Sequence, residues 1–194
     1  MKLFWAHPSA IIDDKAHIGA DTKIWHFTQV LAGAHIGTCC SIGHNCLIGS
    51  KSHIGNGVKI ESNTDVWDLV ELEDYVFVGP SAVFVNDLNP RAKYPKQKFP
   101  EFGTWLPTVV KKGASIGANA TILCGITIGE YAFIGAGSVV TKNIRPYALI
   151  IGIPGKLAGW ICECGTKLIF KNKKTVCSAC RKRYDKKGER IIRV

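Results

Sequence analysis

An aliphatic or aromatic residue recurs at every sixth position along most of this chain. Thirteen such residues follow one another from Ile12 to Phe84, and six more recur at the same interval from Val110 to Val140. The residue two places earlier is usually small, as Ala10 is. A period of six fits neither an α-helix nor a long β-strand, and it predicts short strands that alternate with turns.

The repeat predicts an all-β fold in which these strands wind into a parallel β-helix. Alternate residues of a strand share a face, so each strand turns one large and one small side chain inward. Three strands close a triangular coil of 18 residues, and nineteen repeats stacked at about 4.8 Å per coil give a prism roughly 30 Å tall. Glycine often follows the aliphatic residue, as at Gly19 and Gly37. It suits a turn in which positive φ or crowding would strain a Cβ atom.

One interval in the repeat is much longer than the others. From Phe84 to Val110 the chain advances 26 positions where six are expected, with four prolines and no periodicity. A compact scaffold that keeps a long loop usually uses it for binding or catalysis, although a tolerated insertion has the same pattern. After Val140 the repeat fades, and Pro146 and Pro154 end the regular strands. We therefore expect a β-helix over 1–145 with an extended loop at 85–109, a C-terminal cap of the prism over 146–161, and a separate tail over 162–194.

The basic charge of the chain is concentrated in this tail. Residues 162–194 carry eleven Lys or Arg against three Asp or Glu, a net charge of +8, whereas residues 1–161 carry +2. The first residues are too polar for a secretory signal, and no apolar run is long enough for a transmembrane segment. We expect a cytoplasmic protein with reduced thiols. Cys40 and Cys46 occupy the small position of the repeat, so they are expected to be buried.

The other notable cysteines form two close pairs in the tail. Gly165 follows the pair Cys162 and Cys164, and twelve residues separate Cys164 from Cys177 in the second pair, Cys177 and Cys180. Four thiolates suit tetrahedral zinc, and a segment of this size has too little core to fold without such support. The pattern predicts a zinc-ribbon-like tail, while a metal-free tail stays open because the first pair is separated by one residue rather than two.

A basic ribbon of this kind raises the question of nucleic acid binding. The tail offers only Phe170 and Tyr184 as aromatic side chains, and the rest of the chain gives no reason for such a partner. Nucleic acid is therefore disfavoured relative to a structural or interaction module. An anionic membrane surface and a partner in glycan assembly remain open.

Four motifs carry a more specific resemblance. The segment GPSAVFVND (79–87) with its following Pro-Arg, the WHF triplet (25–27), the segment LPTVVKKGASIGANATILCG (106–125) and GIPGK (152–156) resemble bacterial sugar-nucleotide N-acetyltransferases. That family acetylates the 3-amino group of UDP- or dTDP-linked amino sugars for lipopolysaccharide and other surface glycans. The resemblance covers roughly residues 5–161. It implies left-handed hexapeptide-repeat winding, acetyl-CoA as co-substrate, and a homotrimer with active sites between subunits.

Transfer of an acetyl group to an amine needs little acid–base catalysis from the protein. A sugar amine should titrate no higher than an α-amino group, about 8, so a useful fraction is neutral at neutral pH. Orientation beside the thioester supplies more than a general base does. No histidine lies between Phe84 and Val110. Because O-acetylating enzymes of this superfamily use a histidine base, its absence favours an amino over a hydroxyl acceptor.

The resemblance also nominates residues for the acceptor. Asn86 is expected to orient the acceptor amine, since its amide can accept a hydrogen bond from a neutral amine and cannot deprotonate it. Asp87, Arg91 and Lys93 follow in the loop as substrate-binding candidates, the two cations for phosphates or a uronate carboxylate. His26, in the WHF triplet, is the remaining candidate for substrate contact. The loop sequence resembles the dTDP-deoxysugar members more closely, while UDP remains open.

For coenzyme A the family lays the pantetheine arm along the late coils. The corresponding positions here are two small turns, Gly117-Ala118 and Gly135-Ala136, where backbone can approach the ligand closely. Lys156, in the GIPGK segment, lies where relatives often place a cation near the coenzyme phosphates.

Histidines spaced by one coil suggest a second enzyme class. His17, His35 and His53 are 18 residues apart and should stack on one face, as should His26 and His44 at a corner. A γ-class carbonic anhydrase binds zinc through histidines on this fold. Its ligand pair lies five residues apart, and no such pair occurs here, so the stacked histidines are interpreted as structural. An O-acetyltransferase of the same fold also stays open, as does a non-enzymatic scaffold whose zinc ribbon binds nucleic acid or a partner.

Overall fold

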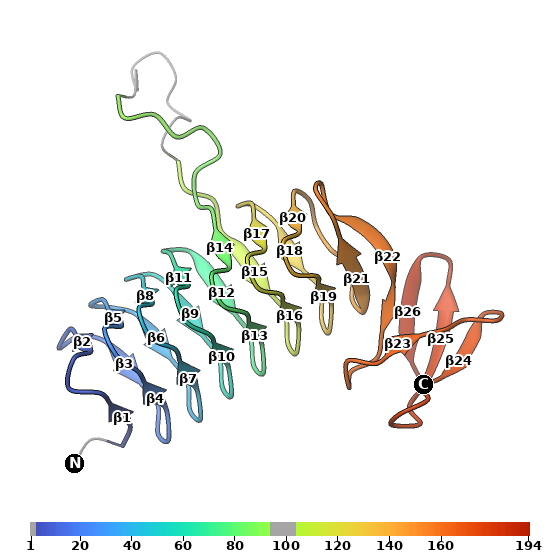
Figure 1. Cartoon of the computed structure of the whole chain (residues 1–194), viewed down its shortest axis with the longest axis horizontal. Coiled ribbons are helices and arrows are strands. Elements are labelled where there is room, and N and C mark those ends of the chain that lie inside the picture. The colour runs from blue at the N-terminus through green and yellow to red at the C-terminus, as the bar shows by residue number, and fades with distance from the viewer. Residues whose placement is uncertain (1–2, 94–103) are drawn as a thin grey trace.

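The computed structural model describes residues 3–93 and 104–194 and shows a long triangular prism with a small sheet at its C-terminal end (Figure 1). Strands β1 to β20 run around the prism in turn, and each pairs in parallel with the strand one coil away. Seven coils result, the last closed by a parallel bridge between Ile128 and Ile144. The described residues contain no helix, and therefore none that could cross a membrane.

Each wall of the prism is one parallel sheet. Sheet A contains β1 (Trp5–Ala6), β4 (Lys23–Ile24), β7 (Ser41–Ile42), β10 (Lys59–Ile60), β13 (Phe77–Val78), β16 (Ser115–Ile116) and β19 (Phe133–Ile134). Sheet B contains β2 (Ile11–Ile12), β5 (Gln29–Val30), β8 (Leu47–Ile48), β11 (Asp65–Val66), β14 (Val83–Phe84), β17 (Thr121–Ile122) and β20 (Val139–Val140). Sheet C contains β3 (His17–Ile18), β6 (His35–Ile36), β9 (His53–Ile54), β12 (Val70–Leu72), β15 (Thr108–Val110) and β18 (Thr127–Ile128).

The interior of the prism is formed by the last residue of each strand from β1 to β20. Ile24, Ile42 and Ile60 stack at successive coils of sheet A, each at most 1% exposed. The small residues two places earlier are buried as well, and the hydroxyl of Thr22 donates to the Gly37 carbonyl at 2.9 Å. Cys40 and Cys46 are buried in this position, which confirms their interpretation as packing residues.

Truncation inside the prism is expected to be costly. Ile48→Ala should lower the free energy of unfolding by about 2–5 kcal/mol, because the fully buried side chain leaves a cavity that the stacked coils cannot close. Urea denaturation followed by circular dichroism measures this loss. Ile11→Ala, on the same sheet but 60% exposed at the surface of β2, is the matched control. Equal losses for the two variants would contradict the packing argument.

The structure separates the two roles that glycine could play in the turns. Gly19, directly after its strand, does not have positive φ, but a Cβ there would lie 2.6 Å from the backbone carbon of Gly37 in the next coil. Positive φ falls two residues later, at Asp21 for that turn and at Gly33 or Gly57 in others. Crowding between coils therefore explains the glycines that directly follow the strands. The position two residues later, where φ is positive, accepts several residue types.

The long insertion lies between β14 and β15, and its described first part, residues 85–93, projects from the side of the prism (Figure 1). Its neck is closed by a hydrogen bond from the Leu106 amide to the Asn86 carbonyl at 3.0 Å. The middle of the predicted loop, residues 94–103, lies outside the described residues. Beyond the prism, sheet A continues with β21 (Ala148–Ile151), which is followed by antiparallel β22 (Lys156–Ile161) and β23 (Lys167–Leu168).

The tail forms a separate antiparallel sheet D of β24 (Lys174–Val176), β25 (Arg183–Lys187) and β26 (Arg190–Arg193). Tyr184 of β25 is fully buried and packs edge-on against Tyr147, which stacks on Tyr131 of the last coil, with 5.6 Å between ring centroids in both pairs. These three rings join the tail to the end of the prism. Arg145 and Glu189 add an exposed ion pair at 2.5 Å.

Candidate functional site

The turns that join sheet A to sheet B stack along one edge of the prism, called here the first corner. Near its N-terminal end it carries a cluster of exposed aromatic side chains. Trp25 packs edge-on against Trp5 with 5.2 Å between ring centroids, and His26 stacks on His7 at 3.5 Å. Trp25 and Phe27 remain 40% and 66% exposed. The triplet that contains the predicted substrate contact His26 therefore presents ring surfaces of Trp25 and Phe27 to solvent.

A pocket adjoins this aromatic cluster. Its volume is about 340 Å³, and its wall combines aromatic, imidazole, hydroxyl and charged side chains: Trp25, His26, Ser41, Gly43, His44, Lys59, Ile60, Glu61 and Ser62. His44 Nδ1 lies 2.7 Å from the Ser62 hydroxyl, and Lys59 Nζ lies 2.9 Å from the Glu61 carboxylate. The pocket thus combines a stacking surface with hydrogen-bonding groups and one accessible cation.

The turns that join sheet B to sheet C form the second corner, and the extended loop projects from it. Asn86 is the second residue after β14 and is half-buried at the neck of the loop. The Asp87 carboxylate accepts a hydrogen bond from the Asn89 amide at 2.8 Å, which shapes the first turn of the loop. Arg91 and Lys93 are exposed, and the Arg91 guanidinium donates to the Pro90 carbonyl at 2.8 Å.

A buried thiol lies beneath this neck. Cys124 is one coil further along the second corner, and burial raises its pKa, with a smaller contribution from the negative charge of Asp87. A raised pKa keeps the thiol protonated and inert.

The small turns predicted to cradle coenzyme A lie on the first corner, in the last two coils. The Gly137 amide donates to the Ala118 carbonyl at 2.8 Å, so the two turns stack directly. A Cβ at Gly117 would lie 2.5 Å from the Ala136 amide nitrogen, so coil stacking by itself requires this glycine. Ala136 is exposed, and Lys156 is exposed at the start of β22, paired with Ile151.

The structure brings some of the predicted site residues together and separates others. His26 and the turns at Gly117 and Gly135 share the first corner, whereas Asn86 and the loop cations occupy the second. Sheet B separates the two corners within one chain. Each wall is one six-residue repeat wide, at most about 20 Å of extended chain. A single chain therefore carries two halves of the predicted site on opposite edges of one wall.

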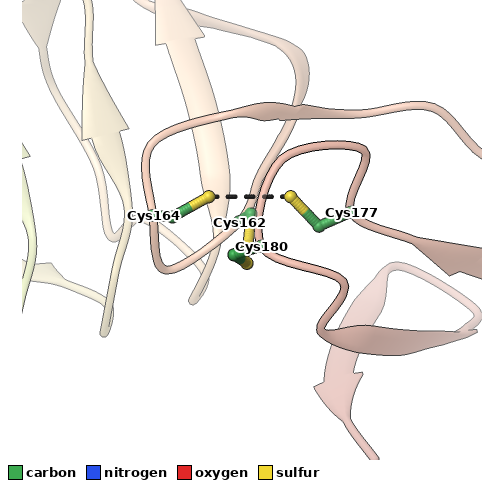
Figure 2. A group of neighbouring side chains, drawn as sticks. All are labelled: Cys162, Cys164, Cys177 and Cys180. Carbon is green, nitrogen blue, oxygen red and sulfur yellow. Dashed lines mark hydrogen bonds between the residues drawn. The ribbon is translucent and has the colours of Figure 1, made fainter.

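The four tail cysteines converge at one point between β22 and sheet D (Figure 2). Their sulfur atoms all lie within 4.8 Å of one another, with 3.3 Å between Cys162 and Cys180 and 3.6 Å between Cys164 and Cys177. Tetrahedral zinc with Zn–S bonds of about 2.3 Å needs sulfur atoms roughly 3.8 Å apart. The cluster can therefore hold such an ion with little rearrangement.

The surroundings of the cluster also suit thiolate ligands. Hydrogen bonds to the Thr166 hydroxyl and amide lower the pKa of the Cys164 thiol to about 6, while burial raises that of Cys162. The Tyr184 hydroxyl lies 3.0 Å from the Cys162 sulfur. The carboxylate of Glu163, between the first two cysteines, accepts hydrogen bonds from Lys182 at 2.6 Å and from Arg193 at 3.1 Å. The bond to Arg193 ties the turn between Cys162 and Cys164 to β26.

Comparison with known proteins places the chain in a family. Models of bacterial transferase hexapeptide repeats match residues 15–50 and 107–142, and the hexapeptide repeat of succinyl-transferase matches 40–66. A dTDP-3-amino-3,6-dideoxy-alpha-D-galactopyranose 3-N-acetyltransferase from Aneurinibacillus thermoaerophilus is 48% identical over 180 residues, which are 93% of this chain and 90% of the relative. The chain belongs to the hexapeptide-repeat sugar-nucleotide N-acetyltransferase family.

Two solved structures have the same fold as this chain. An N-acyltransferase from Bacillus cereus, in complex with dTDP and coenzyme A, has a TM-score of 0.55 at 17% identity and covers 81% of this chain and 83% of its own. A GDP-perosamine N-acetyltransferase from Caulobacter crescentus, with CoA and GDP-perosamine, has a TM-score of 0.50 at 22% identity. That match covers 81% of this chain and 57% of the other. The expectation of a left-handed parallel β-helix is confirmed.

The pocket residues Ser41, Lys59 and Ser62 were missing from the sequence-based prediction of the site. The signal that could find them is the 18-residue period, which places Trp25, Gly43 and Glu61 above one another on the first corner. Counting coils from the WHF triplet reaches Ser62, and counting from Lys23 on the strand before it reaches Ser41 and Lys59. The chemistry of these side chains alone does not single them out.

The histidines of sheet C stack as the 18-residue spacing predicts. His17, His35 and His53 are in register on neighbouring strands, and the rings of His35 and His53 are parallel at 4.6 Å. Partial burial, followed by the charges of His53 and His17, lowers the pKa of His35. Within the parts of the chain that the structure describes, the group suited to a metal consists of the four tail cysteines. The geometry gives no support to a carbonic-anhydrase-like histidine site.

Proposed function

We propose that this enzyme transfers the acetyl group of acetyl-CoA to the 3-amino group of a nucleotide-linked amino sugar, with a dTDP-3-amino-3,6-dideoxyhexose as the first acceptor to test. The observation that carries the proposal is the 48% identity to a 3-N-acetyltransferase across 93% of the chain. The loop neck with Asn86 supports it, because an amide at this position can orient an amine. The product would serve the synthesis of lipopolysaccharide or another surface glycan.

The proposed step needs orientation more than proton transfer. The neutral amine attacks the thioester carbonyl, a C–N bond forms, and the C–S bond breaks as the coenzyme leaves as a thiolate. The excess proton on nitrogen passes to the sulfur, so no side chain has to act as a base. Holding the reactants in an attack geometry can supply up to about 7–11 kcal/mol of the barrier. In this scheme Asn86 accepts a hydrogen bond from the amine and aims its lone pair.

The active enzyme is proposed to be a homotrimer with three sites between subunits. Support comes from the division of the predicted site between two corners of one chain. A three-fold axis parallel to the prism sets the first corner of one subunit beside the second corner of the next. Asn86 with the loop residues Asp87, Arg91 and Lys93 would then face His26 and the late turns of the neighbour. Light scattering on a size-exclusion column should give the mass of three chains.

Coenzyme A is proposed to lie along the C-terminal half of the first corner. The exposed turn at Ala136 and the half-buried turn at Ala118 leave the backbone open to a pantetheine arm. Lys156, exposed at the same end of the prism, would contact the coenzyme phosphates.

The tail cysteines are proposed to hold one structural zinc ion. Support comes from four sulfur atoms within 4.8 Å of one another, a complete set of ligands for a tetrahedral ion. Four free thiols used in this way suit a reducing compartment, which also fits a cytoplasmic enzyme that draws on acetyl-CoA. The boundary proposed between the cap over 146–161 and the tail over 162–194 falls at the end of β22.

A panel of acceptors tests the proposed reaction. Purified enzyme, acetyl-CoA and dTDP- or UDP-linked sugars with a 3-amino group are combined, and the release of free thiol is followed with a chromogenic disulfide. Rapid release is expected with a 3-amino sugar, and none with the matching 3-hydroxy sugar. Equal release with the hydroxy sugar would favour an O-acetyltransferase, and no release with any member would contradict the proposal.

A further inference from the structure

Sheet D has one face packed on the prism end and one face turned away from it (Figure 1). On the packed face the Tyr184 ring contacts Tyr147, and Lys186 Nζ lies 6.0 Å from the centroid of the Trp160 ring on β22. Alternate residues of a strand point to opposite faces, so residues 183, 185 and 187 of β25 are turned away from the prism. This second side of the sheet is called here the outer face.

The outer face combines cations with exposed aliphatic side chains. It consists of the three odd-numbered residues of β25 and the residues paired with them on the two neighbouring strands: Lys174, Val176, Arg183, Asp185, Lys187, Arg190 and Ile192. Four of these seven residues are cations and one is an acid. Val176 and Ile192 are 48% and 41% exposed among them. The outer face is therefore a basic surface with apolar side chains open to water.

A hollow of about 750 Å³ adjoins the outer face. Ile169, which is 73% exposed, and Val194 give it apolar surface. Lys171 lies at its edge with Lys174 and Arg183 and so adds a fifth cation to the region. An apolar hollow with a cationic edge suits a ligand that has an apolar body and an anionic head.

We infer that the outer face of sheet D binds the surface of a lipid bilayer that contains anionic lipids. The inference goes beyond the acetyl transfer, since it concerns where the enzyme is held rather than what it acetylates. Lysine and arginine side chains are attracted to anionic headgroups, and each one near the surface strengthens binding about five-fold. The exposed aliphatic side chains enter the boundary between headgroups and acyl chains.

The composition of the outer face favours lipid over the other anionic partners. Contact surfaces for proteins are enriched in aromatic side chains and depleted in lysine, whereas the seven residues of this face include two lysines and no aromatic side chain. Single-stranded nucleic acid binds on aromatic stacking platforms, which this face also lacks. Interleaved aliphatic and basic residues are typical of proteins that lie on an anionic membrane surface.

The proposed trimer would strengthen this binding. Its three-fold axis runs parallel to the prisms, so the three tails lie level at one end of the assembly. A bilayer extends far enough to contact three outer faces at once, and linked contacts of this kind raise the affinity well above that of one contact. Residues 1–161 carry a net charge of only +2, so the basic surface is concentrated at this end.

Sedimentation of the full-length enzyme with lipid vesicles tests the charged part of the inference. Vesicles of equal parts phosphatidylglycerol and phosphatidylcholine should bind the wild type about ten-fold or more tightly than vesicles of phosphatidylcholine alone. Exchange of Lys174→Gln together with Lys187→Gln should weaken binding to the anionic vesicles about ten-fold or more. Lys15→Gln together with Lys51→Gln is the matched control, because it removes the same charge from exposed lysines of the prism. It should stay within about two-fold of the wild type.

A second variant tests the apolar part. Ile169→Ser should weaken binding to the anionic vesicles about three-fold or more, since each methylene group that enters the bilayer adds about four-fold. The fold should be preserved, because the hydrogen bond that Ile169 accepts from the Thr175 hydroxyl uses its backbone carbonyl. Ile11→Ser, at an exposed isoleucine of β2, is the control and should bind as the wild type does. Circular dichroism should be the same for all variants.

Several results would overturn the inference. Equal binding to neutral and anionic vesicles, or equal losses in the two lysine pairs, would remove the outer face from lipid binding. A DNA duplex that binds more tightly than the anionic vesicles at equal phosphate concentration would assign the face to nucleic acid instead. Turnover with a dissolved acceptor should be the same in every variant, because none of these residues belongs to the proposed acetyl-transfer site. Loss of vesicle binding with full turnover therefore concerns docking alone, whereas an inactive wild type would contradict the transfer.

Discussion

Replacing Cys177 with serine is expected to abolish zinc binding and to unfold the tail. A structural zinc site contributes on the order of 10 kcal/mol or more to a small domain, because the ligands converge only when the segment is folded. Cys177 is buried in the cluster and pairs with Cys164, so a hydroxyl there leaves three thiolates and an incomplete tetrahedron. Atomic emission should fall from about one zinc per chain to a small fraction of that in the variant.

Limited trypsin digestion reports the folding of the tail in the same experiment. The tail contains eleven Lys or Arg, which a folded ribbon protects and an unfolded one exposes. Cys39→Ser is the matched control, because Cys39 is an exposed thiol at a turn of the prism and outside the cluster. It should keep its zinc and its resistance to trypsin. Wild-type protein that contains no zinc, or a Cys177→Ser variant that keeps it, would contradict the site.

The pH dependence of zinc retention has a definite sign. Zinc binds thiolates, so protons compete with the metal, and the ion is retained at high pH and released as the pH falls. The hydrogen bonds that lower the pKa of Cys164 to about 6 favour the thiolate and extend retention towards acid. Release on raising the pH from neutral would be inconsistent with a thiolate site.

The prism was predictable from the sequence because every six-residue unit makes the same contacts with the coils on either side of it. The aliphatic residues from Ile12 to Phe84 mark one strand every six positions, and the small residues two places earlier also point inward. The core residues can therefore be read from the repeat alone. The role of the glycines did not follow in the same way. Whether Gly19 serves positive φ or close stacking depends on a neighbour 18 residues away, and the structure decides for stacking.

The site was predictable only in part, for a similar physical reason. Sequence motifs identified the WHF triplet and the loop, yet the pocket wall at Trp25, Ser41 and Lys59 is assembled from three coils. Convergence of the tail cysteines depends on antiparallel pairing of β22 with β23 and β24 with β25, which follows no repeat. Spacing could suggest the ligand set, but only the folded ribbon brings Cys162 within 3.3 Å of Cys180.

Asn86→Ala is expected to lower turnover about ten-fold or more while the affinity for coenzyme A stays nearly the same. The loop neck should survive, because its hydrogen bond from Leu106 uses the backbone carbonyl of residue 86 rather than the side chain. The loss therefore reports the amide that orients the amine. Steady-state kinetics with the best 3-amino sugar of the acceptor panel gives turnover, and calorimetry gives coenzyme affinity.

Asn89 supplies the matched control for this variant. It is the same residue type three positions further along the loop, and it is exposed, with its backbone amide bonded to Asp87. Because Asn89→Ala keeps that amide, the loop turn is preserved and turnover should stay within about two-fold of the wild type. A ten-fold loss in both variants would mean that the loop as a whole, rather than the Asn86 amide, sets the rate. Full turnover in Asn86→Ala would remove this residue from the reaction, since an amine oriented by other groups needs no amide at the neck.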